Sequence, residues 1–243
     1  MNIEANNKLA PSESGNLNKA NKVINQTIRV KSGRDLVNYC YLVVNRDTNQ
    51  AIIIDPAWEI DKIHSILNAR KCELTSILLT HHHKDHTNLA EELATENKAT
   101  VYMSSREIEH YEFTCRNLAP IKENNIQSAG MDIGVIDTPG HTAGSVCFSI
   151  GDYLYTGDTL FIEGCGVCKG WGSSATHLFE SLTLIKRSFS DKTKIFPGHR
   201  FNQAPGKSLE YVKDNNIYLQ IEDKTEFINL HMRDRDTSNI QYR

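Results

Sequence analysis

One short run constrains this chain more than any other, because it gathers four residues of metal-ligand type within six positions. These residues are His81, His83, Asp85 and His86. The run follows residues 75–79, an apolar stretch typical of a buried strand, and a turn at a strand end can point several side chains at one place. Neutral imidazole nitrogens and carboxylate oxygens suit zinc and similar divalent ions, so the run predicts a metal site. A solvated histidine-rich turn is the alternative. An expression tag is disfavoured, because the run is internal and flanked by core-like sequence.

Three later stretches each add one candidate ligand after an expected strand. His141 lies in a glycine-rich turn, Asp158 follows a hairpin, and His199 follows Pro197 and Gly198. Taken singly, such residues are often turn or cap residues. Together with the first run they make seven ligand-type side chains, a suitable supply for two metal ions a few Å apart with one carboxylate bridging. Asp55, which ends an earlier strand, is expected either to orient a metal-bound histidine or to serve only as a turn residue.

Hydrophobic periodicity predicts an alternation of strands and helices in two similar halves. Strands are expected at residues 23–31, 38–44, 51–54, 75–79, 100–103, 131–137, 146–150, 153–155 and 194–196. Helices are expected at residues 59–70, 89–97 and 176–189, with Thr87 or Asn88 as the N-cap of the second, and a fourth is expected to open at Pro205. Residues 104–125 are interpreted as surface helix and loop beside the substrate entrance. We find no internal repeat and no long linker.

Composition narrows the class of protein. A length of 243 residues with 39% hydrophobic side chains suits one ordinary domain with a sizeable core. The net charge of -3 gives no basic field for nucleic acid, and no apolar run is long enough for a membrane span. Residues 1–22 are polar and lack the apolar centre of a secretory signal. We therefore predict a disordered leader at 1–22, one metal-binding domain at 23–243 with a helical extension after about residue 204, and a cytoplasmic location.

The full set of motifs resembles the metallo-β-lactamase superfamily, in order, from about residue 38 to residue 199. The matching residues are Asp55, His81, His83, Asp85, His86, His141, Asp158 and His199. The resemblance implies an α+β fold, a four-layered αβ/βα sandwich with metals in a cleft at one edge. It also implies two Zn²⁺ ions per chain. By this resemblance His81, His83 and His141 hold the first ion, Asp85, His86 and His199 hold the second, and Asp158 bridges them.

Asp158 places the resemblance in the glyoxalase II-like branch, because β-lactamases of the main dizinc group usually have cysteine at this position. Residues 156–166 are similar to the corresponding segment of glyoxalase II, an enzyme that hydrolyses acyl-glutathione thioesters. Val167, however, stands where that enzyme usually has a basic residue for glutathione, and its C-terminal basic motif is absent after Lys207. Residues 164–168, 172–175 and 197–206 look closer to the zinc hydrolases of bacterial polyketide clusters. This resemblance implies an acyl thioester on a carrier protein or coenzyme A, in polyketide antibiotic biosynthesis.

The expected reaction is attack of a metal-activated water on the thioester carbonyl, with Asp85 and Asp158 as the catalytic carboxylates. An acyl carrier protein as partner would need a basic rim, for which the candidates are Lys169, Lys186, Arg187, Arg200, Arg233 and Arg235. Four other functions remain open: glyoxalase II, a single-iron persulfide dioxygenase, a nuclease, and a metal-dependent scaffold. The nuclease is disfavoured because no basic patch accompanies the motif.

The six cysteines are expected to be free thiols, because nothing indicates export to an oxidising compartment. Cys165 and Cys168 form a Cys-x-x-Cys pair. A single such pair cannot fill a four-coordinate zinc site, and the thioredoxin-like context of a redox motif is missing. Simple packing on a glycine-rich loop is therefore the favoured interpretation of this pair.

Overall fold

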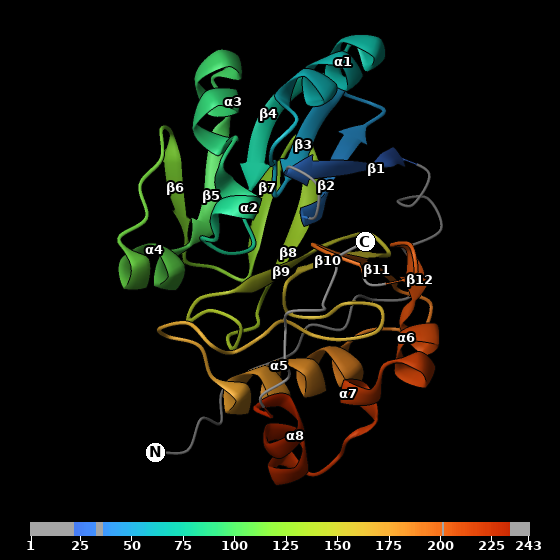
Figure 1. The fold of residues 1–243 in the computed structure, drawn as a ribbon. Helices are drawn as coiled ribbons and strands as arrows, with labels where there is room; N and C mark the ends of the chain where they lie inside the picture. Colours follow the sequence, from blue (N-terminus) through green and yellow to red (C-terminus); the bar gives the residue numbers. More distant parts are fainter. Residues whose placement is uncertain (1–21, 33–35, 201, 234–243) are drawn as a thin grey trace.

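Two six-stranded β-sheets pack face to face, and helices cover the outer face of each (Figure 1). The computed structural model describes residues 22–32, 36–200 and 202–233. The predicted leader, residues 1–22, lies outside the described residues except for Lys22, and Arg235 of the expected basic rim lies outside them as well. The predicted four-layered αβ/βα sandwich is confirmed.

The first sheet has the strand order β1-β2-β3-β4-β5-β6. Its strands are β1 (Val23–Ser32), β2 (Leu36–Asn45), β3 (Gln50–Ile54), β4 (Glu73–Leu78), β5 (Thr100–Ser104) and β6 (Leu118–Ile121). Strands β1 to β3 pair antiparallel, and β3 to β6 pair parallel. The three parallel pairs need crossover helices, which are α1 (Ile60–Arg70), α3 (Ala90–Asn97) and α4 (Ser105–Tyr111).

The second sheet has the strand order β12-β11-β10-β9-β8-β7. Its strands are β7 (Asn125–Ser128), β8 (Met131–Asp137), β9 (Val146–Ile150), β10 (Tyr153–Gly157), β11 (Lys194–Pro197) and β12 (Lys207–Ser208). Strands β7 to β10 form an antiparallel meander, and β10 pairs parallel with β11. The crossover between these two strands is α5 (Ala175–Ser188).

Strand β2 shows how the sequence specifies the layers. Its run of apolar residues is buried on both faces, as expected for a central strand. Cys40, Leu42 and Val44 face the core beneath the helices of the first sheet, whereas Tyr41 and Val43 face the core between the sheets. A third apolar core lies between the second sheet and α5, with α6 (Leu209–Asn215), α7 (Ile217–Gln220) and α8 (Lys224–His231) completing that outer layer.

The predicted strands and the helices at 59–70 and 176–189 are found within one or two residues of their expected ends. Two details of the prediction are wrong. The metal-binding run contains its own helical turn, α2 (Lys84–Thr87), so neither Thr87 nor Asn88 caps α3, which begins after Leu89 without a side-chain cap. The last predicted helix does not open at Pro205, because Ser208 caps α6 by accepting a hydrogen bond from the Tyr211 amide.

Three strands lie outside the sequence predictions: β6 falls in residues 104–125, expected as helix and loop, β7 falls in residues 125–128, for which no element is expected, and β12 falls in the helix expected to open at Pro205. The first interval does contain a helix, α4 (Ser105–Tyr111), as well as β6. All three lie at sheet edges, with four residues in β6 and β7 and two in β12. Such short edge strands carry too little alternation to be recognised from sequence.

All six cysteines lie in the described residues, and none of them forms a disulfide bond, as predicted. In the described part of the chain, we find no helix with the length and apolar character that a membrane crossing requires.

Candidate metal centre

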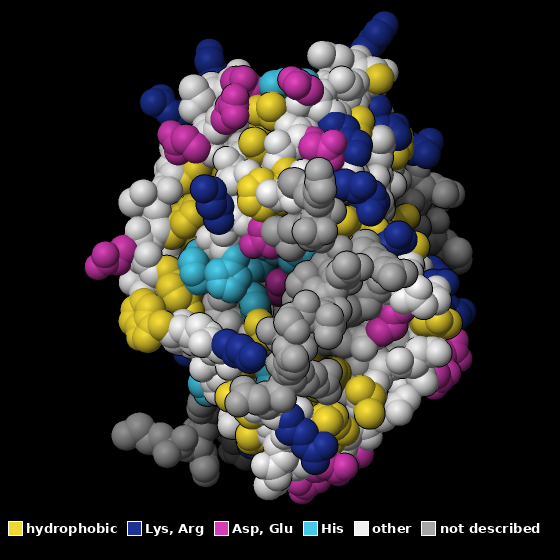
Figure 2. All heavy atoms as spheres, viewed as in Figure 1, with side chains coloured by type: hydrophobic (Ala, Val, Ile, Leu, Met, Phe, Trp, Pro, Cys, Tyr) yellow, Lys and Arg dark blue, Asp and Glu magenta, His cyan; other side chains and the backbone are white. Residues whose placement is uncertain are grey.

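All seven predicted ligand residues lie at one edge of the sandwich, directly after strands of both sheets. The helical turn α2 and the residues before it follow β4, while the other three candidates follow β8, β10 and β11. The two sheets meet at this edge, where the Tyr39 amide of β2 donates a hydrogen bond of 2.9 Å to the Gly198 carbonyl oxygen. Figure 2 shows the histidine side chains in a hollow on this face, with acidic side chains beside them.

Three imidazoles form the first group. The Nε2 atoms of His81 and His141 each lie 3.0 Å from Nδ1 of His83, and His81, His83 and His141 can offer their nitrogens to one ion. Nitrogen ligands of a tetrahedral zinc ion with Zn–N bonds near 2.0–2.1 Å stand roughly 3.3 Å apart. The observed spacing is close to that value, so this group fits a small divalent cation.

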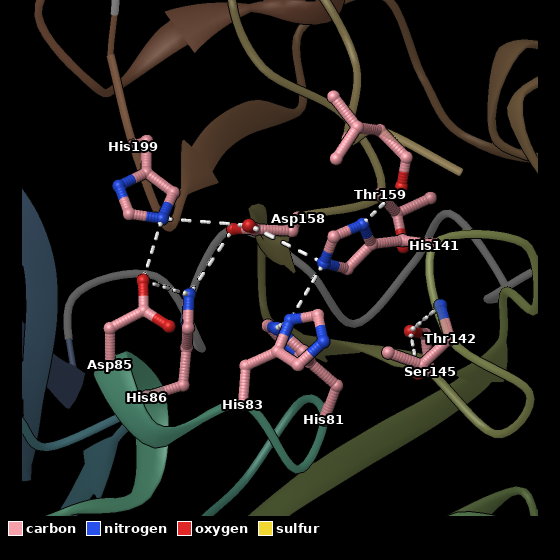
Figure 3. Close-up of polar contacts among 12 residues, drawn as sticks. His81, His83, Asp85, His86, His141, Thr142, Ser145, Asp158, Thr159 and His199 are labelled. Carbon is pink, nitrogen blue, oxygen red and sulfur yellow. Dashed lines mark hydrogen bonds and ion pairs between the residues drawn. The ribbon is translucent and has the colours of Figure 1, made fainter. Parts of the chain in front are cut away.

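The second group contains Asp85, His86 and His199. Nε2 of His199 lies 3.2 Å from Oδ2 of Asp85, and Nε2 of His86 lies 3.6 Å from the same oxygen. Asp158 stands between the two groups: one of its oxygens is 3.6 Å from His141 Nε2, and both approach the second group, at 3.3 Å from His86 and 3.5 Å from His199 (Figure 3).

Hydrogen bonds on the far side of the rings fix which nitrogen faces the centre. Nδ1 of His141 donates to the Val167 carbonyl at 2.7 Å, and Nδ1 of His199 donates to the Val37 carbonyl at 2.9 Å. His86 Nδ1 donates to Asp55 Oδ2 at 2.9 Å. In each case the lone pair of Nε2 is left to point into the centre, as in the second shell of metal sites.

Asp55 therefore takes the orienting position that the sequence left undecided. It accepts hydrogen bonds from the amide and the hydroxyl of Thr80, at 2.8 and 2.7 Å, in addition to that from His86. The Thr80 oxygen lies 3.0 Å from Nδ1 of His81. Asp55 has a left-handed backbone, with φ of 49°, which is uncommon for a residue other than glycine. One carboxylate thus supports both the first and the second group.

Two buried atoms show that the centre suits a cation. Nε2 of His86 and Oδ1 of Asp158 are inaccessible, and apart from facing each other at 3.3 Å neither makes a hydrogen bond to a described residue. Buried polar atoms are otherwise almost always hydrogen-bonded. A metal ion between them would satisfy both. The donor set of five imidazoles and two carboxylates is also the set that zinc prefers.

The two groups differ in protonation in the absence of metal. Burial, together with the neighbouring imidazoles, lowers the pKa of His83 to about 4 and lowers that of His81 well below the usual value. Burial also opposes charge on His199, but Asp158 and Asp85 outweigh it and raise the pKa of His199 to about 9. Asp158 and Asp55 likewise raise the pKa of His86 well above its usual range despite its burial.

Two glycines permit the close packing around the centre. A Cβ atom at Gly166 would lie 2.0 Å from the Asp158 carbonyl oxygen and 2.8 Å from Nδ1 of His141. A Cβ atom at Gly198 would lie 2.5 Å from the His86 ring and 2.6 Å from Asp158 Oδ1. Any side chain at these two positions would displace candidate ligands.

His82, although it lies in the same run, does not join the centre. Its ring stacks on Tyr111 with a centroid distance of 3.6 Å, and its Nδ1 lies 2.6 Å from Glu107 Oε1. The Tyr111 hydroxyl donates to the Trp171 carbonyl at 2.9 Å. The Trp171 side chain is 73% exposed, so an aromatic rim borders the histidines.

The Cys-x-x-Cys pair is buried in the apolar core under the second sheet. Cys168 Sγ donates to the Gly140 carbonyl at 3.2 Å, and burial raises its pKa to about 12, so this thiol stays protonated at neutral pH. The packing interpretation of Cys165 and Cys168 agrees with this placement.

Sequence reasoning did not identify Asn38, Thr80 or Glu107. Asn38 and Thr80 contact candidate ligands directly, whereas Glu107 contacts their chain neighbours His82 and Thr142. Asn38 donates to Asp85 Oδ2 at 3.0 Å and to its backbone oxygen at 2.9 Å. The only local signal was a polar residue inside an apolar stretch, which is informative because buried polar groups need partners. Nothing in the sequence indicated which partner each would find.

A family model described as the metallo-beta-lactamase superfamily matches residues 33–118 and 128–199. The chain is 47% identical over 197 residues to the "Probable polyketide biosynthesis zinc-dependent hydrolase BaeB" of Bacillus velezensis, a match covering 81% of this chain and 88% of the relative. It is 41% identical, with the same coverage, to the corresponding protein PksB of Bacillus subtilis.

More distant matches include a hydroxyacylglutathione hydrolase of Shewanella halifaxensis, 29% identical over 75% of this chain and 69% of the relative. Among solved structures, the crystal structure of ETHE1 from Myxococcus xanthus superposes with a TM-score of 0.76 and 27% identity, covering 86% of this chain and 90% of that one.

Proposed function

The chain belongs to the metallo-beta-lactamase superfamily, and from this membership we propose that it is a zinc-dependent hydrolase that cleaves acyl thioesters in polyketide biosynthesis. The names of the relatives at 47% and 41% identity support the hydrolase, the zinc and the pathway. The observation that carries the proposal is the convergence of all seven candidate ligands around Asp158 at one edge of the sandwich.

We assign two Zn²⁺ ions to this centre. His81, His83 and His141 would hold the first ion, and Asp85, His86 and His199 would hold the second. Asp158 would be shared, because its carboxylate approaches His141 on one side and both His86 and His199 on the other. This arrangement is typical of two-metal hydrolytic sites.

Zinc at this centre would supply a Lewis acid and a water acidic enough to ionise near neutral pH. Asp85 and Asp158 are placed to orient that water by accepting its hydrogen bonds, because the neighbouring imidazoles, against the effect of burial, keep the pKa of both carboxyl groups below the usual range and so keep both groups ionised. Asn38 holds Asp85 in place for this role. A thiolate leaves readily, so the chain needs no strong general acid.

The test combines metal analysis with a panel of acyl thioesters of pantetheine, coenzyme A, a carrier protein and glutathione. The wild-type protein is expected to contain two zinc ions and to hydrolyse the pantetheine-type thioesters. Replacing Asp158 by Ala should remove the second ion and lower turnover by at least about 100-fold. Full metal content and unchanged turnover in this variant would refute the assignment.

Hydroxyacylglutathione hydrolysis is the second candidate, favoured by the match to enzymes of that name. Val167, which is 48% exposed beside the centre, speaks against it, because no charge is available there for the glutathione carboxylates. Faster hydrolysis of lactoyl-glutathione than of acyl-pantetheine would reverse the order of the two candidates. One iron per chain together with oxygen uptake would instead identify a persulfide dioxygenase.

We also propose that the thioester is presented by an acyl carrier protein. Figure 2 shows Lys and Arg side chains on both sides of the histidine hollow, which supports an acidic partner. Lys169, Arg187 and Arg233 are exposed, whereas Lys186 is paired with Glu222 and bonded to the Leu219 carbonyl. Lys186 is therefore the weakest member of the predicted rim.

Charge reversal tests this partner. Changing Lys169 and Arg200 to Glu should raise the KM for a carrier-bound substrate by about tenfold and leave the KM for a small acyl thioester within about twofold, since surface charges mainly steer association. The matched control is Lys192→Glu, at an exposed position on the turn before β11. Equal effects on both substrates would exclude the carrier protein.

A further inference from the structure

Glu107 is a buried carboxylate whose hydrogen bonds join two loops of the metal centre. It lies in the first turn of α4, and its exposed fraction is 0%. Oε1 accepts from the His82 amide at 2.9 Å and lies 2.6 Å from the His82 ring nitrogen Nδ1. Oε2 accepts from the Thr142 hydroxyl at 2.9 Å and from the Gly144 amide at 2.8 Å. Four donors thus surround one charge, the arrangement that a buried carboxylate requires.

The partners of Glu107 flank the three histidines of the first group. His82 stands between His81 and His83 in the sequence, so fixing its backbone amide and ring fixes the turn that points its two neighbours at the same place. Thr142 follows His141 directly. A single side chain therefore sets the distance between the His81–His83 turn and the His141 loop, which are the two parts of the first group.

The position of Glu107 is itself determined by tight packing. Ser104 caps α4 by accepting from the Glu107 amide at 3.1 Å, and its hydroxyl donates to the Gly144 carbonyl at 2.6 Å. A Cβ atom at Gly144 would lie only 2.3 Å from the Glu107 amide nitrogen. Helix α4 is thus docked against the His141 loop without room for adjustment.

The second group has its own support. Asn38 holds Asp85 through two hydrogen bonds, and its side-chain oxygen accepts from the Trp58 indole at 2.9 Å. Asn38 is 1% exposed and lies on β2, remote in the sequence from α4. Glu107 and Asn38 therefore support different groups, in addition to Asp55, which supports both.

We propose that Glu107 is a positioning residue that sets the metal affinity of the His81, His83 and His141 group selectively, while Asn38 does the same for the group of Asp85, His86 and His199. The inference rests on the proposed two-metal function, because it assigns separate determinants to two ions. It predicts that each substitution weakens metal binding to one group and leaves the other unchanged. General destabilisation of the fold would weaken metal binding to both groups.

The experiment measures Co²⁺ binding to each group alone, by the visible absorbance of the cobalt ion during titration of the full-length, metal-free protein. The background variant His199→Ala reports the first group, and His83→Ala reports the second. Adding Glu107→Gln should weaken Co²⁺ binding by about 10- to 100-fold in the first background, since lost second-shell contacts have effects of that size. In the second background it should change the Co²⁺ affinity by less than about twofold. Adding Asn38→Ala should give the reverse pattern.

Thr142→Val serves as a milder companion variant, because it removes one donor to Glu107 and keeps the size of the side chain. It should weaken the first group by several-fold and leave the second unchanged. Circular dichroism of the metal-free protein shows whether Glu107→Gln folds. If it does not fold, Thr142→Val tests the positioning role of Glu107 in its place.

The possible failures are distinguishable. If neither background variant binds Co²⁺, the proposed two-metal function is wrong. If both bind, but Glu107→Gln and Thr142→Val change the two groups equally or not at all, the function stands and the positioning role of Glu107 is overturned.

Discussion

At the scale of single residues, the metal centre depends on which nitrogen of each imidazole ring faces it. Four of the five candidate histidines turn Nε2 toward the centre, and His83 alone presents Nδ1. Oxygen acceptors behind the rings, such as the carbonyls of Val37 and Val167, fix these choices. The two groups consequently differ in proton content, with His83 neutral and His199 charged at pH 7 when metal is absent.

This difference predicts unequal proton release on metal binding. At pH 7 the second group must lose protons from His199 and His86, whose pKa values are both raised, before it can bind a cation, whereas His81 and His83 are already neutral. Calorimetric titration of Zn²⁺ in two buffers of different ionisation enthalpy measures the protons released. Release should be greater in the His83→Ala background than in the His199→Ala background, and identical release from both would contradict the assignment of charge.

Gly166 makes a second prediction at this scale. Gly166→Ala places a Cβ atom against the Asp158 carbonyl and the His141 ring, so zinc content and turnover should both fall by about tenfold or more, as overpacking of a rigid site displaces its ligands. Gly170→Ala is the matched control on the same loop, because a Cβ atom there meets nothing within 4 Å. A Gly166→Ala protein with normal zinc content would contradict this prediction, because the loop would then have moved to accommodate the Cβ atom without displacing the ligands.

At the scale of elements, short helices hold the loops that carry the candidate ligands. Helix α4 supports the His141 loop through Ser104. Helix α8 reaches the loop at residues 164–168, where Nε2 of His231 lies 2.8 Å from the Gly166 carbonyl oxygen while its ring stacks on Phe227. That loop in turn supplies the Val167 carbonyl that orients His141, so the C-terminal helix supports the metal centre indirectly.

Replacing His231 by Phe should keep the stacking on Phe227 and remove the hydrogen bond to Gly166. The free energy of unfolding should fall by about 1 kcal/mol, and amide hydrogen exchange at residues 164–168 should accelerate. Ser208→Ala, which removes the N-cap of α6, should cost a similar roughly 1 kcal/mol without changing exchange in this loop. Equal exchange in both variants would exclude the supporting role of α8.

At the scale of the whole molecule, the metal centre lies where the two halves meet. Candidate ligands after β4 belong to the first sheet, and those after β8, β10 and β11 belong to the second. A cation bound by both would therefore bind the folded protein and not the unfolded chain, which stabilises the fold by mass action.

Chelation should accordingly lower the melting temperature, by several degrees or more, and added Zn²⁺ should restore it. The measurement is calorimetry of the protein before treatment with a chelator, after it, and after return of the metal. A melting temperature that is indifferent to the chelator, in protein that contains zinc, would place the ions elsewhere.

The metal-free protein should also lose stability as the pH rises. The pKa of His199 is raised to about 9 by Asp158 and Asp85 despite burial, so its ion pairs stabilise the fold fully below about pH 6.5 and progressively less as the pH rises through 9. The melting temperature of the metal-free protein should therefore fall between pH 6.5 and pH 9, and a His199→Ala variant should show a smaller fall.

The sequence by itself determined the order of strands and helices and the identity of the seven candidate ligands, and its resemblance to the metallo-β-lactamase superfamily implied the sandwich. Buried strands and amphipathic helices leave periodic patterns, and metal ligation demands particular residue types after strand ends, so both can be found without coordinates. Edge strands β6 and β7 escaped because four residues carry too little pattern.

Only the tertiary structure decided how those ligands are held. The Asp55–Thr80 and Glu107–His82 contacts each join residues 25 apart, and Asn38 and Asp85 are 47 apart. No local pattern predicts such pairs, because a buried polar side chain takes whatever partner the packing of the sheets brings to it.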